Sequence, residues 1–343
     1  MSRVIEHLAE ITGFRDRDVL DVTLVGALRD LLLPASVAIY RILGEAPQQR
    51  WMTRARLLPG DVAATADPLW ADPESLPLAD SVPDRYACLR RQEVFTVPGS
   101  PAMAYFPLTS DNEAVGVLEI ATAAPMEPAD VRLVGSILRI YRNFQGMLDY
   151  SERDTLTGLL NRKTFDDSFL RIAAGPQIDA EDLAKPGLRR PSPQDTAWLG
   201  VIDIDHFKHV NDTFGHLMGD EVLLLLSRLM RGSFRFQDRL YRFGGEEFVV
   251  LMRCGGVDDA LAAVERLRAN VERYPFPQVG HITVSVGLTA LRPGDSPASA
   301  FDRADKAVYY AKQHGRNQVR HHATLVSEGH LVDESRTSDI ELF

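Results

Sequence analysis

The sequence predicts a two-domain protein of the mixed α/β (α+β) class, in which a sheet-and-helix domain precedes a βαββαβ domain. Its 343 residues amount to about two domains at roughly 150 residues each. The N-terminal half combines helical periodicity with a strand hairpin, whereas strands and helices alternate through the C-terminal half. Such alternation indicates helices packed on an open sheet.

The composition excludes several classes of protein. A hydrophobic share of 45% and a charged share of 25% are ordinary for a globular chain and exclude disorder, collagen and a disulfide scaffold. The net charge of −10 opposes binding to nucleic-acid polymers or anionic lipid, so any phosphate ligand needs local cations, metals or backbone amides. Cys88 and Cys254 are too few for a disulfide framework or a zinc site. With no signal-peptide pattern and no membrane-length apolar run, we expect a cytoplasmic protein.

The first half begins with helical spacing over residues 4–33, with a break near Gly13 and an end before Pro34. Residues 36–42 alternate as a strand does, and the stretch 59–83, dense in Pro, Asp and Ala, predicts irregular surface connections. Strands at 103–108 and 115–121 flank a polar five-residue connection, which predicts an antiparallel hairpin.

A long helix is expected to follow this hairpin. Its apolar residues are spaced by three and four and cover about two heptads: Val134, Ile137, Tyr141, Phe144 and Leu148. That length leaves two interpretations equally open, a short coiled coil and a helix packed on its own domain.

The order of elements in this half carries a resemblance. A Phe106-Pro107-Leu108 strand, a polar turn, the run Val115-Gly116-Val117-Leu118 and a Pro-x-Asp helix start resemble the C-terminal half of a GAF sensory domain, over about residues 15–148. A PAS-like sensor is the alternative. We therefore expect a GAF-like sensor at 1–125 and a connecting signalling helix at 126–153. No cyclic-nucleotide signature points to its ligand, so the signal could be a small molecule or a protein.

The second half predicts strands and helices in turn, at 197–204, 219–230, 239–243, 248–252, 258–273, 283–290 and 297–314. We assign this domain to 154–322. Residues 174–196 are rich in Pro, Asp and Arg and predict an extended surface loop. From residue 323 to 343 the chain is polar and acidic, which predicts a frayed tail.

Two places in this half suggest chemistry. The first is Gly244-Gly245-Glu246-Glu247 between two apolar strands, where glycines suit a tight turn and adjacent carboxylates suit a divalent cation. Alone, these four residues would fit an ordinary hairpin with solvated glutamates better than a metal site. The second is the strand 198–204, which runs into Asp203, Asp205 and Lys208. Treated as the carboxyl end of a parallel strand, it would place Asp203 beside Glu246 to hold Mg²⁺ together with substrate phosphates.

With these residues, the second half resembles the GGDEF domain of diguanylate cyclases, in its Gly-Gly-Glu-Glu-Phe form. The likeness covers about 170 residues and many separate motifs, and the 174–196 insertion is its main departure. The matching segments are Asp-Thr-Leu-Thr-Gly-Leu-Leu-Asn-Arg at 154–162, the run from Asp203 to His216, Gly219-Asp220, the signature, Ser285-Val286-Gly287, the run from Ala304 to Lys312, and Gly315-Arg316-Asn317.

The resemblance implies a role for each matching residue. Asp203, the carbonyl of Ile204 and Glu246 would bind Mg²⁺ or Mn²⁺, while Glu247 would assist at the metal or near the attacking hydroxyl. Guanine would be recognised by Asn211 and Asp220. The phosphates would meet Lys208, the amides of His206 and Phe207, and the pair Lys312 and Arg316, spaced i, i+4 on one helical face.

The implied reaction condenses two GTP into cyclic di-GMP and two pyrophosphates across a homodimer, since each domain offers half of a symmetric site. Arg235-x-x-Asp238 stands where the family binds its product as an inhibitor, and Arg266 could complete that site. The alternatives are a silent domain that binds GTP or cyclic di-GMP and signals by conformation, and a cyclase that also accepts ATP. A silent domain would not need the acidic and the basic residues together, so their joint presence argues against the first alternative. Asp220 argues against the second alternative.

Overall fold

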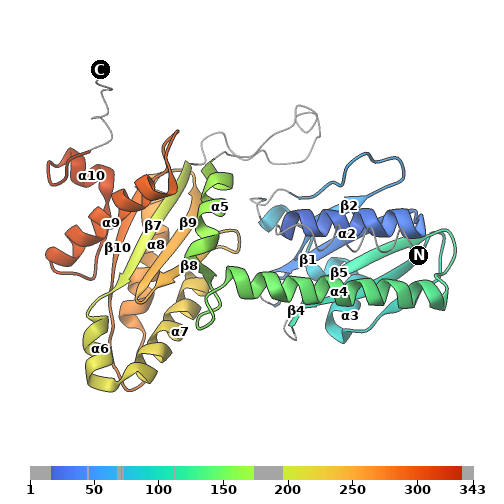
Figure 1. Cartoon of the computed structure of the whole chain (residues 1–343), viewed down its shortest axis with the longest axis horizontal. Helices are drawn as coiled ribbons and strands as arrows, with labels where there is room; N and C mark the ends of the chain where they lie inside the picture. The colour runs from blue at the N-terminus through green and yellow to red at the C-terminus, as the bar shows by residue number, and fades with distance from the viewer. Residues whose placement is uncertain are drawn as a thin grey trace. The chain divides into compact units, whose positions relative to one another are not determined.

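The structure is a computed structural model that describes residues 17–44, 46–67, 71, 73–110, 113–173 and 196–333. The chain divides into two compact units, Met1–Ser151 and Glu152–Phe343 (Figure 1). We call them the N-terminal unit and the C-terminal unit and describe each by itself. Within the described residues, no helix combines the length and the apolar character needed to cross a bilayer.

The N-terminal unit is built on a five-stranded antiparallel sheet in the order β2-β1-β5-β4-β3. The predicted hairpin is confirmed, because β4 pairs with β5 along its whole length. The predicted break near Gly13 lies outside the described residues. The elements are α2 (Arg17–Leu32), β1 (Ser36–Leu43), β2 (Arg50–Leu57), the 3₁₀ turns η1 (Pro73–Ser75) and η2 (Ala79–Ser81), α3 (Pro83–Arg91), β3 (Phe95–Val97), β4 (Ala102–Ser110), β5 (Glu113–Thr122) and α4 (Pro128–Glu152).

Helices α2 and α4 share the core on one face of this sheet (Figure 1). The apolar stripe of α4 is buried there, with Val134 and Tyr141 almost fully covered. The stripe is therefore accounted for by packing within its own unit rather than by a coiled coil. On the opposite face, α3 packs Cys88 and Leu89 against the strand residues Trp51 and Tyr105. Burial raises the pKa of the Cys88 thiol to about 12, so this cysteine behaves as a small apolar residue.

The C-terminal unit contains a six-stranded sheet in the order β11-β10-β7-β9-β8-β6. The treatment of residues 198–204 as a parallel strand is wrong, because β7 runs antiparallel to both β10 and β9, and only the edge pairs β10–β11 and β6–β8 are parallel. The elements are β6 (Leu160–Asn161), α5 (Arg162–Ala173), β7 (Thr196–Ile204), α6 (Phe207–Phe214), α7 (His216–Ser233), β8 (Arg239–Gly244), β9 (Glu247–Cys254), α8 (Val257–Arg273), β10 (Val284–Ala290), α9 (Pro297–Gln313), β11 (Val319–His321) and α10 (His322–Ser327).

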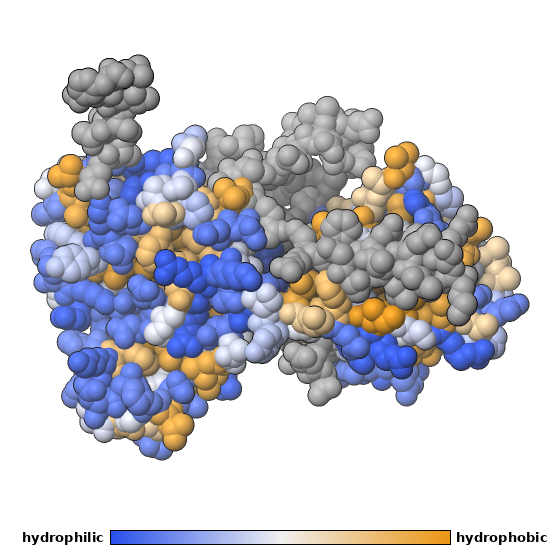
Figure 2. Space-filling model, viewed as in Figure 1, coloured by the Kyte–Doolittle hydropathy of each residue, from blue (hydrophilic) through white to orange (hydrophobic). Residues whose placement is uncertain are grey.

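Helices cover both faces of this sheet (Figure 1). Alternate residues of β7, such as Ile202 and Ile204, join the main core with α7 and α8. Asp203 therefore faces the side on which α9 packs against β7 and β10. The face of this unit seen in Figure 2 is mainly hydrophilic, in keeping with a core enclosed between two helical layers.

Two segments of this unit were predicted to be irregular, the tail from residue 323 and the loop at 174–196. The tail expected from residue 323 begins instead with helix α10, which buries Leu325 and His322 beside α9. His322 and Leu325 are three residues apart and so share one helical face. Two residues are too few to form a recognisable helical pattern in a polar sequence. Of the loop predicted at 174–196, residues 174–195 lie outside the described residues, and Thr196 begins β7.

Candidate active site

The signature residues form the turn between β8 and β9. Gly244 pairs with Glu247, so Gly245 and Glu246 make a two-residue connection, which confirms the predicted hairpin. Gly244 has a φ of 142° and Gly245 a φ of 52°, conformations that glycine adopts without a Cβ penalty. In the neighbouring pairing Glu247 lies directly opposite Asp203. Because β7 and β9 are antiparallel, the end of one strand meets the start of the next at the same edge of the sheet.

Arg242 holds this turn in place. Its Nε and Nη2 donate to the carbonyl of Gly245 at 3.1 and 2.9 Å, and its Nη1 donates to Asp154 at 3.0 Å. Asp154 also accepts from the amide and the hydroxyl of Thr157, at 2.8 and 2.6 Å. Burial opposes the charge of Asp154, but these hydrogen bonds outweigh it and hold the pKa of that carboxyl below its usual value. The 154–162 motif therefore braces the signature hairpin.

The carboxylates at this edge repel one another. Burial raises the pKa of Asp203. Lys312 opposes this rise, and the charges of Asp205 and Asp305 add to it. Burial and then the charge of Asp203 also raise the pKa values of Glu246 and Glu247. For Asp305, on α9, burial and the charge of Asp302 have the same effect. We call Asp203, Glu246, Glu247 and Asp305 the acidic cluster. Asp305 stood in the sequence motif with no role assigned, and its place in the cluster is visible only in three dimensions.

Lys312 provides the positive charge in contact with this cluster. Its Nζ lies 2.7 Å from Oδ1 of Asp203, whose side chain is 10% exposed. This ion pair is the single contact of the buried Oδ1, which accepts no well-aligned hydrogen bond within the described part of the chain. A carboxylate oxygen held in this way is ready to exchange one cation for another.

The donor set fits a hard divalent cation. Asp203 Oδ1, the carbonyl of Ile204 and the carboxylate of Glu246 are oxygen donors of the kind that Mg²⁺ and Mn²⁺ prefer. The described residues contain no ready-made cluster of three His, Cys, Asp or Glu ligands. Two carboxylates and one carbonyl leave positions open, and Mg²⁺ usually fills such positions with water and substrate phosphate.

Asp205 has a different function from Asp203, although the two are two residues apart. It accepts hydrogen bonds from the hydroxyls of Thr283 and Ser285 at 2.6 and 2.7 Å and from the amide of Asn317 at 3.0 Å. These contacts fasten the end of β7 to β10 and to the turn after α9. Sequence reasoning assigned Asp205 no role, because the polar partners are far away in the chain.

The predicted guanine-binding residues meet where α6 turns into α7. Gly219 packs so closely on α6 that a Cβ there would collide with Oδ1 of Asn211. Asn211 therefore lies over the first turn of α7, and Asp220 is exposed beside Gly219. Two exposed apolar side chains, Phe214 and Leu217, occupy the same corner, where Figure 2 shows hydrophobic surface at the α6–α7 end of the unit.

The predicted phosphate-binding residues are only partly brought together. Lys208 is exposed in the first turn of α6, next to His206 at the helix start and the buried Phe207. Lys312 adjoins the acidic cluster, as described above. The placement of Arg316 on the same helical face is wrong, because α9 ends at Gln313 and Arg316 follows in a left-handed conformation with a φ of 60°. Gly315 initiates this reversal, and the Arg316 amide bonds back to the carbonyl of Ala311.

The three residues of the predicted inhibitory site lie at one corner: Arg235 and Asp238 in the turn between α7 and β8, and Arg266 on α8, where its charge acts on Asp238. Asp238 accepts from the amide of Arg235 at 2.8 Å, which closes the turn. Burial raises the pKa of Asp238 to about 6, against the opposing charges of Arg235 and Arg266. Arg266 is itself anchored, since its Nε and Nη2 donate to the carbonyl of Ser233 at 2.9 and 2.5 Å.

The C-terminal unit thus has the fold and the acidic hairpin of a GGDEF domain, and comparison with known proteins agrees. Residues 151–318 match the family described as "Diguanylate cyclase, GGDEF domain". This half of the chain belongs to that family.

Individual relatives resemble this half as well. Diguanylate cyclase DgcP of Pseudomonas aeruginosa is 39% identical over 169 residues, which are 48% of this chain and 23% of that protein. Response regulator PleD of Caulobacter vibrioides is 36% identical over 219 residues, 60% of this chain and 45% of PleD. The crystal structure of the GGDEF domain of DgcB from Caulobacter crescentus with c-di-GMP is 34% identical, with a TM-score of 0.42 over 50% of this chain and 93% of that one. The chain therefore spans less than half the length of these two curated relatives.

Proposed function

We propose that this chain is a diguanylate cyclase that condenses two GTP into cyclic di-GMP and two pyrophosphates. The observation that carries the proposal is the pairing of Asp203 with Glu247 across β7 and β9, with Glu246 in the adjoining turn and Lys312 beside them. This arrangement concentrates oxygen donors and one cation at a single sheet edge, within a domain of the diguanylate cyclase family.

The acidic cluster supplies the catalytic groups. Asp203, the carbonyl of Ile204 and Glu246 hold Mg²⁺ or Mn²⁺, which when bound neutralises phosphate charge and lowers the pKa of the attacking 3′-hydroxyl. Glu247, on the strand beside Asp203, assists at the metal or accepts the hydroxyl proton. The raised pKa values of these carboxyls, caused by burial and then by the charges of neighbouring carboxylates, support such a site, because a bound cation stabilises their charged forms.

Substrate recognition is assigned to residues around the cluster. Asn211 and Asp220 bind guanine, since a carboxylate accepts well from guanine N1–H and its amino group, whereas adenine would leave Asp220 without a partner. The exposed Leu217 offers apolar surface to the base in the same corner. The β- and γ-phosphates are bound by Lys208, the amides of His206 and Phe207, Lys312 and Arg316.

The symmetric product requires two such half-sites, so we propose a homodimer as the active form. Cyclic di-GMP would inhibit it at Arg235, Asp238 and Arg266, which the structure gathers at one corner beside the signature strand. The N-terminal unit, as a GAF-like sensor followed by the helix at 126–153, would regulate this activity in the cytoplasm. In this regulation, the two copies of the helix at 126–153 in the dimer would shift their register relative to each other.

The test is turnover of the full chain with GTP and Mg²⁺, with cyclic di-GMP measured by liquid chromatography. Glu246→Gln and Asp203→Asn should abolish product while the circular dichroism spectrum and GTP binding persist. Glu265→Gln, an exposed glutamate on α8, is the matched control and should keep full turnover. A wild-type chain that binds GTP or cyclic di-GMP and makes no product would favour the silent alternative. Arg235→Ala should raise the product concentration that halves turnover.

A further inference from the structure

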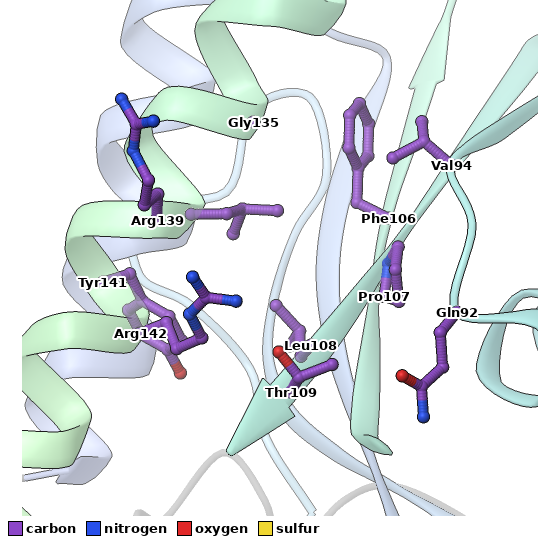
Figure 3. A pocket seen from close by; sticks show the side chains of 11 residues that line it. Gln92, Val94, Phe106, Pro107, Leu108, Thr109, Gly135, Arg139, Tyr141 and Arg142 are labelled. Atoms are coloured by element: carbon purple, nitrogen blue, oxygen red, sulfur yellow. The ribbon is translucent and has the colours of Figure 1, made fainter. Parts of the chain in front are cut away.

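A cavity of about 500 Å³ opens in the N-terminal unit between helix α4 and the outer edge of β4 (Figure 3). It exists for two reasons. Strand β3 pairs with β4 only from Met103 to Tyr105, so the following stretch of β4 has no described strand on that side, while β5 pairs with it on the other. On the facing helix Gly135 contributes no side chain, and the space at its Cβ position is open. A volume of this size is typical of small-molecule sites.

The lining combines an apolar floor with a cationic rim. Phe106 and Leu108 are buried members of the core and form the floor. Two exposed arginines of α4, Arg139 and Arg142, stand at the rim, and neither forms an ion pair with another described residue. Figure 3 shows the guanidinium group of Arg142 extending from the helix toward the cavity, while that of Arg139 rises along the helix.

We propose that this cavity binds a small organic carboxylate with an apolar body. The floor favours hydrocarbon, and a guanidinium group can hold a carboxylate through two parallel hydrogen bonds. The chain as a whole repels anions, so the two arginines are a local exception to its net charge of −10. A cationic ligand is opposed by the same arginines. A peptide added as a strand is opposed by Pro107, which interrupts this edge of the sheet.

The cavity also borders a buried polar network. Tyr141, which lines it, accepts hydrogen bonds from Arg41 and Gln145, both at 2.8 Å, and donates one to Asp21. Asp21 pairs in turn with Arg54, its Oδ2 lying 3.3 Å from Nε. This network joins α4 to α2 and to the first two strands. A ligand in the cavity therefore rests against the helix that ends the N-terminal unit, at the residue that fixes it to the sheet.

Two probes test the proposal on the full chain by isothermal titration calorimetry: 2-naphthoate, with an aromatic body, and octanoate, with an alkyl body. We expect at least one to bind, and the double variant Arg139→Gln/Arg142→Gln to weaken it at least tenfold. Gly135→Leu should abolish binding, because a Cβ at this position meets no other atom within 4 Å and the rest of the new side chain occupies the cavity. The uncharged alcohol of the same body should bind at least tenfold more weakly.

Matched controls are available on the same helix. Arg132→Gln removes an exposed arginine that does not line the cavity, and Gly146→Leu adds a side chain at another open helical glycine. Both should bind the probe as the wild type does, with melting temperatures recorded for every variant. The proposal is overturned if neither probe binds, if the double arginine variant binds unchanged, or if acid and alcohol bind equally.

Discussion

Replacing Lys312 by methionine should make the nucleotide-free chain bind Mn²⁺ more tightly. In the structure the ammonium group lies 2.7 Å from Oδ1 of Asp203, the oxygen assigned to the metal, so an entering cation must displace it. At that distance and an effective dielectric constant of 20, two unit charges attract by about 6 kcal/mol. Lys312 is 30% exposed, however, and on release its ammonium regains water, which leaves a net of about 1 kcal/mol, or roughly fivefold in affinity.

The assay is a Mn²⁺ titration followed by electron paramagnetic resonance of the free ion at pH 8. Alkaline pH is needed because removing Lys312 also removes a charge that lowers the pKa of Asp203, and the proton would otherwise compete with the metal. Lys306→Met is the control, since Lys306 pairs with Asp302 at 2.9 Å on the same helix and should leave the affinity unchanged. Turnover of Lys312→Met should nevertheless fall, because a phosphate contact is lost. If Lys312→Met bound Mn²⁺ no more tightly than the wild type does, the proposal that the metal displaces the ammonium group from Asp203 would be refuted.

Three further predictions concern stability. Arg303→Met should lower the free energy of unfolding by about 3–5 kcal/mol, because the Asp295 carboxylate, whose side chain is 8% exposed, would lose an ion pair at 2.6 Å; calorimetry measures this, and adding Asp295→Leu should restore most of it. Gly287→Ala should cost more than about 1 kcal/mol in urea unfolding, because its Cβ would collide with the carbonyl oxygen of Ala304 and force α9 away from β10; an unchanged midpoint would contradict this packing. For the acidic cluster, raised pKa values mean that the native state holds protons which the unfolded state releases from about pH 4 upward. The metal-free chain should therefore lose stability as pH rises through those values, and Mn²⁺ should raise the melting temperature more at pH 8 than at pH 5, whereas equal shifts would count against the cluster.

Local sequence patterns predicted the elements whose formation depends on residues close together in the sequence. The paired glycines between two apolar runs predicted the β8–β9 hairpin, and a polar connection between two expected strands predicted the β4–β5 hairpin, as the structure confirms. The direction in which β7 lies relative to its neighbours was wrong, because a fully apolar strand looks the same whether its partners are parallel or antiparallel. The error did not displace the site, since antiparallel pairing still brings Asp203 to the start of β9.

Contacts between distant parts of the chain could not be predicted in this way. Helical spacing placed Arg316 on the face of Lys312, although the helix was expected only to residue 314 and glycine, here Gly315, commonly follows a helix end; the i, i+4 rule was applied beyond that end. Short elements were missed for another reason: charged residues hide the apolar period of β2 and of α3, and the burial of Cys88 appears only when α3 docks on the sheet.

Asp203 and Asp205 lie at the end of the same strand but have different roles: Asp205 stabilises the fold, whereas Asp203 belongs to the candidate active site. The two carboxylates are almost equally buried, at 7% and 5% exposure. Three hydrogen bonds, from Thr283, from Ser285 and from the amide of Asn317 in the turn after α9, engage both oxygens of Asp205, so its charge is compensated within the fold. The polar partner of Asp203 Oδ1 within the described residues is the ammonium group of Lys312, so the fold leaves the charge of Asp203 to be neutralised by this cation or by a metal ion. Asp205→Asn should therefore lower stability with or without Mn²⁺, whereas Asp203→Asn should remove the metal-dependent part of stability alone. If both variants lost the Mn²⁺-dependent rise in melting temperature equally, this division of labour would be wrong.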